Sequence, residues 1–326
     1  MTSLNQPKLV TVFGGSGFVG RHVVRALARR GYRIRVAVRR PDLAVHLQPL
    51  GGVGQIMAVQ ANLRNRESVD RAVRGADHVV NCVGILFESG RNSFDAVQDF
   101  GARAVAEAAR AVGAGLTHIS ALGADLASDS HYAASKGRAD AEILKILPSA
   151  VILRPSIVFG PEDDFFNKFA EMARFAPALP LIGGGKTRFQ PVYVGDVAEA
   201  VARSVEGRVE GGAIYELGGP RVMSFRECLE EVLRVTRRQR SLVSVPWGIA
   251  SLIGRIGSLI PLIDPPLTAD QVLLLRSDNV VSDEATSQGR TLAGLGIPQT
   301  TVEAVLPSYL ARYRPHGQFS GTGREA

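Results

Sequence analysis

The sequence predicts an α/β protein: a doubly wound parallel sheet in its first half, followed by a smaller C-terminal α+β lobe. Two observations support this class. Short apolar runs rich in Val and Ile alternate with amphipathic segments from Leu9 to Arg154, and a glycine-rich turn joins the first run to the first amphipathic segment. Strands alternating with helices of this length form βαβ units, which assemble into a parallel sheet covered on both faces.

Six apolar runs are the candidate strands, and a stretch expected to be helical separates each from the next. In chain order they are LVTVFG (9–14), RIRVAV (33–38), GQIMAV (54–59), HVVNCVG (78–84), LTHIS (116–120) and AVILRP (150–155). We therefore assign residues 1–154 to a dinucleotide-binding domain, with a returning segment near 186–206.

Beyond Pro155 the alternation stops, and joints of Gly and Pro interrupt the chain. This pattern predicts a smaller lobe over 155–313, and the polar, glycine-containing tail 314–326 is expected to be disordered. The apolar stretch 246–263 is too short and too interrupted for a membrane span. It is either a buried helix of the small lobe or a segment lying in a membrane interface.

Composition limits the classes of function. With 326 residues, 45% of them hydrophobic, the chain can bury a sizeable core in one large or two coupled domains. Its two cysteines lie far apart, which fits a reducing compartment, and its six histidines show no metal-site pairing, so we expect no metal.

The net charge of +7 favours anionic partners such as phosphate groups or the acidic face of a membrane. Nucleic acid is not expected, because no basic segment is interleaved with aromatic residues. The first residues form no apolar signal segment, and we expect a cytoplasmic location.

Three glycines at three-residue spacing, Gly14, Gly17 and Gly20, follow the first strand and open the first helix. Glycine allows a positive φ in the turn, lets the backbone approach a pyrophosphate, and packs the helix close to the sheet. The N-terminus of the helix then binds the phosphates. A glycine-rich turn without a ligand is the alternative, and the flanking strand and helix favour binding.

The glycine spacing and four later motifs together resemble the extended, atypical branch of the short-chain dehydrogenase/reductase superfamily. The later motifs are NCVG (81–84), YAASK (132–136), RPSIVFGP (154–161) and PVYVGDV (191–197). The resemblance implies a Rossmann-type fold and a catalytic set of Ser120, Tyr132 and Lys136, with Lys136 also reaching the nicotinamide ribose. Ser120 ends the fifth strand, where we expect its hydroxyl to hold the substrate oxygen.

The charge at the end of the second strand favours NADP(H) over NAD. NAD-binding chains present an acid there, whereas this strand ends in Arg39 and Arg40, with no acid before Asp42. The guanidinium fork matches phosphate oxygens; two solvated arginines are the alternative, and their place at the end of the strand favours NADP(H). The cofactor contacts expected from the motifs are Gly14, Ser16, Gly17, Phe18, Gly20, Arg39, Arg40, Asn62, Asn81, Val83, Gly84, Tyr132, Lys136, Pro155 and Ile157.

Tyr132 and Lys136 lie four residues apart on an expected helix, so both side chains leave the same face. A nearby ammonium lowers the pKa of a phenol, which would let Tyr132 act as an acid or base; an ordinary exposed pair is the alternative. Many relatives carry an Asp where Asn62 stands. The Asn that often assists the family's proton relay is absent, because Gln98 stands in that segment.

A narrower resemblance rests on FGPEDDFFNKFA (159–170) and KTRFQPVYVGDV (186–197). These segments are similar to the family of NADPH-binding, dehydrogenase-like accessory subunits of respiratory complex I and their bacterial homologues. The resemblance implies an accessory or assembly role, with complex I subunits and the inner membrane surface as partners and a peripheral place on its cytoplasmic face. The alternative is an active NADP-dependent oxidoreductase or epimerase with a small-molecule substrate, for example in ubiquinone biosynthesis.

Overall fold

The computed structural model describes residues 7–257, 268–315 and 317, and the chain divides into two compact units. The first unit comprises 1–155, 195–216 and 284–297, and the second comprises 156–194, 217–283 and 298–326. The sequence-based boundary at 154/155 is thus close to the first division, while the returning segments are 195–216 and 284–297 instead of 186–206. The expected disordered tail lies almost wholly outside the described residues.

Within the described residues, one sheet of seven strands forms the centre of the first unit, in the order β11-β6-β5-β4-β1-β2-β3. The register joins β1 to both β2 and β4, and continues through β5 to β6, with every one of these pairs parallel. The strands are β1 (Leu9–Phe13), β2 (Arg33–Val38), β3 (Ile56–Gln60), β4 (His78–Asn81), β5 (Gly115–Ile119), β6 (Val151–Pro155) and β11 (Ile214–Leu217). This is the doubly wound parallel sheet that the sequence predicts.

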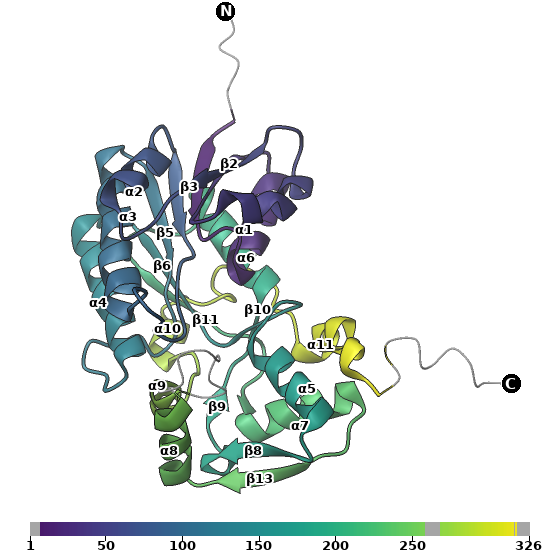
Figure 1. Ribbon diagram of the computed structural model, residues 1–326. Coiled ribbons are helices and arrows are strands. Elements are labelled where there is room, and N and C mark those ends of the chain that lie inside the picture. The colour runs from purple at the N-terminus through teal and green to yellow at the C-terminus, as the bar shows by residue number, and fades with distance from the viewer. Residues whose placement is uncertain (1–6, 258–267, 316, 318–326) are drawn as a thin grey trace, which may run out of the picture. The chain divides into compact units, whose positions relative to one another are not determined.

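Helices cover both faces of this sheet (Figure 1). On one face lie α2 (Arg66–Val73), α3 (Phe100–Ala111) and α4 (His131–Ile146), and on the other lie α1 (Phe18–Arg29) and α6 (Val194–Val205). Arg30, after α1, forms ion pairs of 2.7 Å with Glu199 and Glu206 at α6. The connection after β2 is a 3-10 helix, Pro41–Leu50, which begins at a proline and contains Pro49 near its end.

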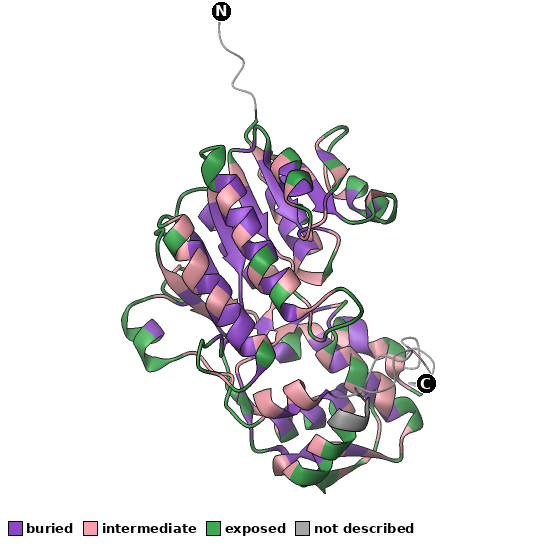
Figure 2. Ribbon diagram, turned by 60° about the vertical axis from the view of Figure 1, so that its left-hand side comes forward, coloured by how far each residue is buried: buried purple, intermediate pink, exposed green. Residues whose placement is uncertain are grey.

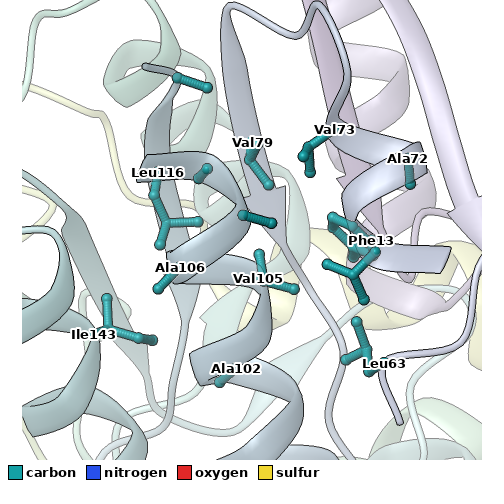
Figure 3. Packing of buried hydrophobic residues seen from close by; sticks show 14 of the residues in the cluster. Phe13, Leu63, Ala72, Val73, Val79, Ala102, Val105, Ala106, Leu116 and Ile143 are labelled. Carbon is teal, nitrogen blue, oxygen red and sulfur yellow. The ribbon is translucent and has the colours of Figure 1, made fainter. Parts of the chain in front are cut away.

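Small side chains form the core under α3. Ala102, Val105 and Ala106 on this helix pack against Val79 and other residues of the sheet (Figure 3). Small side chains let the helix approach the strands closely, and the central strands β1, β4 and β5 are mostly buried (Figure 2).

Among the described residues, the second unit combines helices with three two-stranded sheets: β7 with β10, β9 with β12, and β8 with β13. The strands are β7 (Val158–Phe159), β8 (Ala178–Ile182), β9 (Arg188–Phe189), β10 (Val192–Tyr193), β12 (Met223–Ser224) and β13 (Ser241–Val245). Its helices are α5 (Phe165–Phe175), α7 (Phe225–Thr236), α8 (Trp247–Gly257), α9 (Ala269–Leu274) and α11 (Val302–Leu310). The short helix α10 (Asp283–Ser287) lies almost wholly in the first unit, which resumes at Glu284.

Aromatic rings fill the core of the second unit. Phe166 is fully buried, and its ring meets those of Phe159 and Phe165 edge-on at centroid distances of 6.1 and 5.0 Å. Phe169 packs in the same cluster, against Phe225 at 5.4 Å. These phenylalanines of the FGPEDDFFNKFA segment are therefore core residues.

Candidate functional site

The sequence-predicted site residues of the first unit gather at the carboxyl edge of its parallel sheet. The glycine turn follows β1, the arginine pair follows β2, Asn62 follows β3, the NCVG turn ends β4, and Ser120 follows β5. In open α/β sheets, ligands bind at this edge. The topology thus brings together motifs that lie more than 100 residues apart in the chain.

The turn between β1 and α1 has the shape that a pyrophosphate requires. Gly14 has φ of 72°, and its N–H donates to the carbonyl of Ala37 on β2. A Cβ on Gly20 would lie 2.2 Å from the carbonyl oxygen of Gly14, so only glycine fits there. Gly17 begins the helix, no side chain of the described residues caps it, and the first turn carries no acid. The first N–H groups of α1 therefore suit a phosphate ligand.

Arg21 stabilises the same turn. Its Nη2 donates to the carbonyl of Ser16 at 3.2 Å, and its Nε donates to the carbonyl of Gly17 at 3.3 Å. The guanidinium therefore lies against the glycine-rich backbone and adds positive charge to the helix N-terminus. Phe18, the first helical residue, packs edge-on against His22 at 6.0 Å.

Arg39 and Arg40 both lie exposed just beyond β2. Arg40 forms an ion pair of 2.7 Å with Asp42, and both side chains are largely exposed. An exposed pair of this kind is weak, so Arg40 can exchange Asp42 for a phosphate at little cost. Residues at this end of β2, such as Arg39 and Arg40, face the adenosine ribose in dinucleotide-binding folds.

Asn81, at the end of β4, is buried and organises the neighbouring strand ends. Its Oδ1 accepts the N–H of Val83, and its amide lies 3.1 Å from Nδ1 of His118 on β5. The NCVG turn then passes Lys136: a Cβ on Gly84 would lie 3.5 Å from its Nζ. Asn81 thus shapes the turn that the cofactor is expected to contact.

Lys136 is buried, with only 3% of its surface exposed, and its Nζ donates to the carbonyl of Ile119 at 3.1 Å. Burial lowers the pKa of this ammonium to about 8, while Asp140 and Cys82 oppose the shift. Burial in turn raises the pKa of the Cys82 thiol to about 12. The lysine is therefore mostly a cation at neutral pH, in a position from which it can hold a ribose hydroxyl.

Ser120, a member of the expected catalytic set, forms a hydrogen bond within the protein. It is buried, and its hydroxyl donates to Oδ2 of Asp140 at 2.8 Å. Arg154 on β6 donates from Nε to the same oxygen at 2.9 Å. Burial raises the pKa of the Asp140 carboxyl, and the charge of Arg154 opposes this rise.

Tyr132 lies on the same face of α4 as Lys136, and its ring packs edge-on against Phe94 at 5.8 Å. Gln98 lies in a short π-helix before α3, where its Nε2 donates to the carbonyl of Ile85 at 2.7 Å. Its Oε1 lies 3.3 Å from the hydroxyl of Ser135. Gln98 thus links the segment after β4 to the helix that carries Tyr132 and Lys136.

The remaining predicted contacts are distributed over both units. Asn62 is half-buried, and its Oδ1 accepts the N–H of Arg64, which shapes the turn after β3. Pro155 ends β6 in the first unit, and its carbonyl accepts the N–H of Leu122. Ile157 belongs to the second unit, where its carbonyl accepts the N–H of Val192.

Three site residues were not predicted from the sequence: Arg21, His118 and Asp140. The four-residue spacing between Lys136 and Asp140 places both on one face of α4, and this signal could have identified Asp140. Arg21 follows the glycine motif directly. His118 gave no such signal, because only the pairing of β4 with β5 brings it beside Asn81. Within the described residues, no group of three or more His, Cys, Asp or Glu side chains is arranged to hold a metal ion.

The parallel sheet, the glycine turn and the Tyr132–Lys136 pair define a dinucleotide-binding protein of the Rossmann type. The chain belongs to the NAD dependent epimerase/dehydratase family, whose sequence pattern matches residues 10–218. Members of this family bind NAD(P), in agreement with the glycine turn described above.

Among curated proteins, the chain is similar to the mitochondrial NADH dehydrogenase (ubiquinone) 1 alpha subcomplex subunit 9. The Arabidopsis thaliana protein is 34% identical over 85% of this chain and 72% of its own length. The Rattus norvegicus protein is 31% identical over 96% of this chain and 82% of its own length. A ceramide reductase of Caulobacter vibrioides is 32% identical over 79% of this chain and 74% of its own length.

Solved structures share the fold at low sequence identity. A UDP-glucose 4-epimerase of Thermus thermophilus in complex with NAD has a TM-score of 0.60 and 24% identity, and covers 88% of this chain and 99% of its own. An NADPH-dependent quinone oxidoreductase of Escherichia coli in complex with NADPH has a TM-score of 0.70 and 19% identity, and covers 93% of this chain and 99% of its own.

Proposed function

We propose that this chain binds NADP(H) at the carboxyl edge of its parallel sheet and acts as an accessory or assembly subunit of respiratory complex I. The observation that carries the proposal is the long match to complex I subunits, which extends over 85% to 96% of the chain. The glycine turn, Arg21 and the buried Lys136 supply the nucleotide site. A tightly bound nucleotide stabilises the fold by mass action, which suits a structural role.

The preference for NADP(H) rests on charge. Arg39 and Arg40 lie at the end of β2, where an acid would bind the ribose hydroxyls of NAD. A guanidinium binds a 2′-phosphate through two parallel hydrogen bonds. Isothermal titration calorimetry of the purified protein with NADPH and with NADH tests the preference. We expect NADPH to bind at least about tenfold more tightly; equal affinities would contradict it.

A membrane surface is the second proposed partner, and α8 is the element that would meet it. Ile249, Leu252 and Ile253 are each about half exposed and follow the i, i+3, i+4 spacing of one helical stripe, while Ala250 is buried. The described part of the 246–263 stretch is thus neither fully buried nor polar, and residues 258–263 lie outside the described residues. No helix among the described residues is long and apolar enough to cross a bilayer.

Vesicle sedimentation tests this surface. We expect the protein to sediment with vesicles of phosphatidylglycerol and phosphatidylcholine, and the paired change Leu252→Ser and Ile253→Ser to reduce the bound fraction several-fold. The matched control is Phe175→Ser, which replaces another exposed apolar residue of the same unit, 75% exposed, outside α8. Equal binding of all three proteins would contradict a role for α8. Binding that depends on Leu252 and Ile253 would support a peripheral membrane contact through α8.

An NADP-dependent oxidoreductase is the second candidate function, and the presence of Tyr132 and Lys136 favours it, together with the similarity to a ceramide reductase. A bound nicotinamide supplies or accepts the hydride. Tyr132 would then exchange the proton with a substrate oxygen, and Lys136 would hold the ribose. Tyr132→Phe separates the two functions, because it should abolish turnover and leave an accessory role intact.

The decisive experiment is native-gel migration of the tagged protein from gently solubilised membranes of its host. We expect the protein to migrate with NADH:quinone oxidoreductase activity after a salt wash, and Tyr132→Phe to migrate with it equally. A protein that runs free of this activity would overturn the accessory role. Reduction of long-chain ketones or quinones, lost in Tyr132→Phe, would then support the oxidoreductase.

A further inference from the structure

A buried polar cluster lies beneath the proposed nucleotide site, and neither the family pattern nor the proposed function assigns it a role. It joins His118 on β5, Ser120 after β5, Asp140 on α4 and Arg154 on β6. His118 and Asp140 are each 1% exposed. Burying an ionised carboxylate is costly unless its charge is paired or stabilises another group, so the neighbours of Asp140 indicate its role.

The hydrogen bonds determine which groups carry charge. Asn81 accepts the N–H of Val83 with its Oδ1, so its amide nitrogen donates to Nδ1 of His118. The imidazole proton is then on Nε2. Burial, followed by the charge of Lys136, lowers the pKa of His118 well below its usual value, and the ring is neutral. Asp140 is the acidic group of this cluster, and Arg154 is its cationic partner.

The two oxygens of Asp140 have unequal environments. Oδ2 accepts both Ser120 and Arg154, whereas Oδ1 has no partner among the described residues. Nε2 of His118 is likewise without a hydrogen-bond partner among them, and lies 3.9 Å from this Oδ1. The carboxylate is therefore held by one oxygen, while the charge on the other stays uncompensated by any hydrogen bond from the described chain.

Lys136 is the group that responds to this charge. It lies one helical turn before Asp140 on the same face of α4, and its ammonium is fixed to the carbonyl of Ile119, the residue before Ser120. The groups that act on it are Asp140 and the Cys82 thiol. Burial alone favours the neutral amine, and the carboxylate favours the cation.

We propose that Asp140 is a positioning residue which, together with Ser120, holds Lys136 as a buried cation at the nucleotide ribose. The proposal rests on the proposed nucleotide site. It gives Ser120 a role different from the substrate contact that its motif implies: its hydroxyl orients Asp140. Asp140 and Ser120 touch neither substrate nor cofactor in this role, and act only through Lys136.

The lysine content of the chain makes a direct test possible. The sequence contains only five lysines, so protein labelled with ε-¹³C-lysine gives five signals, and Lys136→Arg identifies the one from Lys136. Titration of this signal in the nucleotide-free protein measures the pKa of Lys136, expected at about 8. Circular dichroism and thermal unfolding report whether each variant is folded, and the signals of the other four lysines, which are all exposed, serve as internal references for the titration.

We expect Asp140→Asn to lower this pKa by at least about one unit, because the carboxylate is lost and burial remains. Ser120→Ala should lower it by less, and Ser120→Thr, which keeps the hydroxyl, should restore it. An unchanged pKa in folded Asp140→Asn would overturn the proposal. If Asp140→Asn fails to fold, identical pKa values in wild type, Ser120→Ala and Ser120→Thr would overturn it.

Addition of NADPH to the same samples separates this proposal from the proposed function. A wild-type Lys136 signal that does not move with NADPH would contradict the nucleotide site, and the titrations without nucleotide would still decide the role of Asp140. A purely structural role for Asp140 would change the stability of the variant and leave the pKa of Lys136 where it is.

Discussion

The two compact units of the chain are held together by different kinds of core. In the first, α3 contributes the small side chains of Ala102, Val105 and Ala106 to a core that also contains Phe13 and Leu116. In the second, edge-on phenylalanine rings around Phe166 fill the interior. The comparison teaches that small side chains on α3 let this helix pack closely on the sheet of the first unit, whereas the interior of the second unit depends on the fit of large aromatic rings.

We expect the largest loss of stability from a substitution in the aromatic core of the second unit. Phe166→Ala removes a fully buried ring and should lower the free energy of unfolding of the second unit by about 3–5 kcal/mol. The only tryptophan of the chain, Trp247, lies in this unit, so its fluorescence during urea unfolding follows the change. Phe175→Ala, at a ring 75% exposed, is the control and should change stability by less than about 0.5 kcal/mol. A loss below about 1 kcal/mol in Phe166→Ala would contradict an aromatic core.

We expect the next largest effect from a substitution at the close contact between Gly20 and the carbonyl of Gly14 in the first unit. Gly20→Ala places a Cβ 2.2 Å from the carbonyl of Gly14, and should cost about 1–3 kcal/mol and weaken NADPH binding at least about tenfold. Calorimetric titration measures the binding. Gly52→Ala is the control, because its Cβ would meet only a flexible side-chain oxygen at 3.7 Å. Wild-type affinity in Gly20→Ala would show that the turn has room to adjust.

A buried pair makes the second unit sensitive to pH. Tyr309 donates its hydroxyl to Asp163, and both are buried. Burial raises the pKa of the Asp163 carboxyl, and the bond from Tyr309 opposes this rise. An acid with a raised folded-state pKa destabilises the fold as pH increases through that pKa, because the folded state then loses a proton that it binds more tightly than the unfolded state.

Tyr309→Phe tests whether Asp163 makes the stability of the second unit depend on pH. The loss of the hydroxyl raises the pKa of Asp163 further, so the variant should be less stable than wild type by about 1–3 kcal/mol at pH 7.5 and by clearly less at pH 4.5. Urea unfolding followed by Trp247 fluorescence at both pH values measures the difference. A deficit that is the same at both pH values would mean that only packing, and not the carboxylate, responds to the change.

The smallest expected effect concerns cofactor selection in the first unit. Arg39→Gln should weaken NADPH binding by about 1–2 kcal/mol and leave NADH binding unchanged, because only the 2′-phosphate contact is lost. Arg40→Gln should weaken NADPH binding by less, since Arg40 already shares its charge with Asp42. Fluorescence titration with both nucleotides distinguishes these outcomes. Equal losses of binding free energy for NADPH and NADH would mean that the arginines attract any anionic nucleotide and do not recognise the 2′-phosphate.

Local spacing in the sequence was enough to predict much of the first unit. The apolar runs predicted strands β1 to β6, and the glycine spacing predicted the turn before α1, because strand pattern and turn geometry depend on neighbours in the chain. The same is true of Tyr132 and Lys136, which share a helix face through their four-residue spacing. The fold class, the glycine turn before α1 and the shared face of Tyr132 and Lys136 were therefore predictable from the amino acids alone.

Tertiary structure decided the rest. The sequence alone predicts that the Ser120 hydroxyl holds a substrate oxygen. Only the approach of α4 to the ends of β5 and β6 shows that this hydroxyl donates to Asp140, and that Arg154 donates to the same carboxylate oxygen. The second unit gave weaker signals, because its short strands pair across large sequence separations, as β12 does with β9. Which segments distant in the sequence come into contact decides burial, strand pairing and the electrostatic effect of one side chain on another. Local periodicity in the sequence does not specify these contacts.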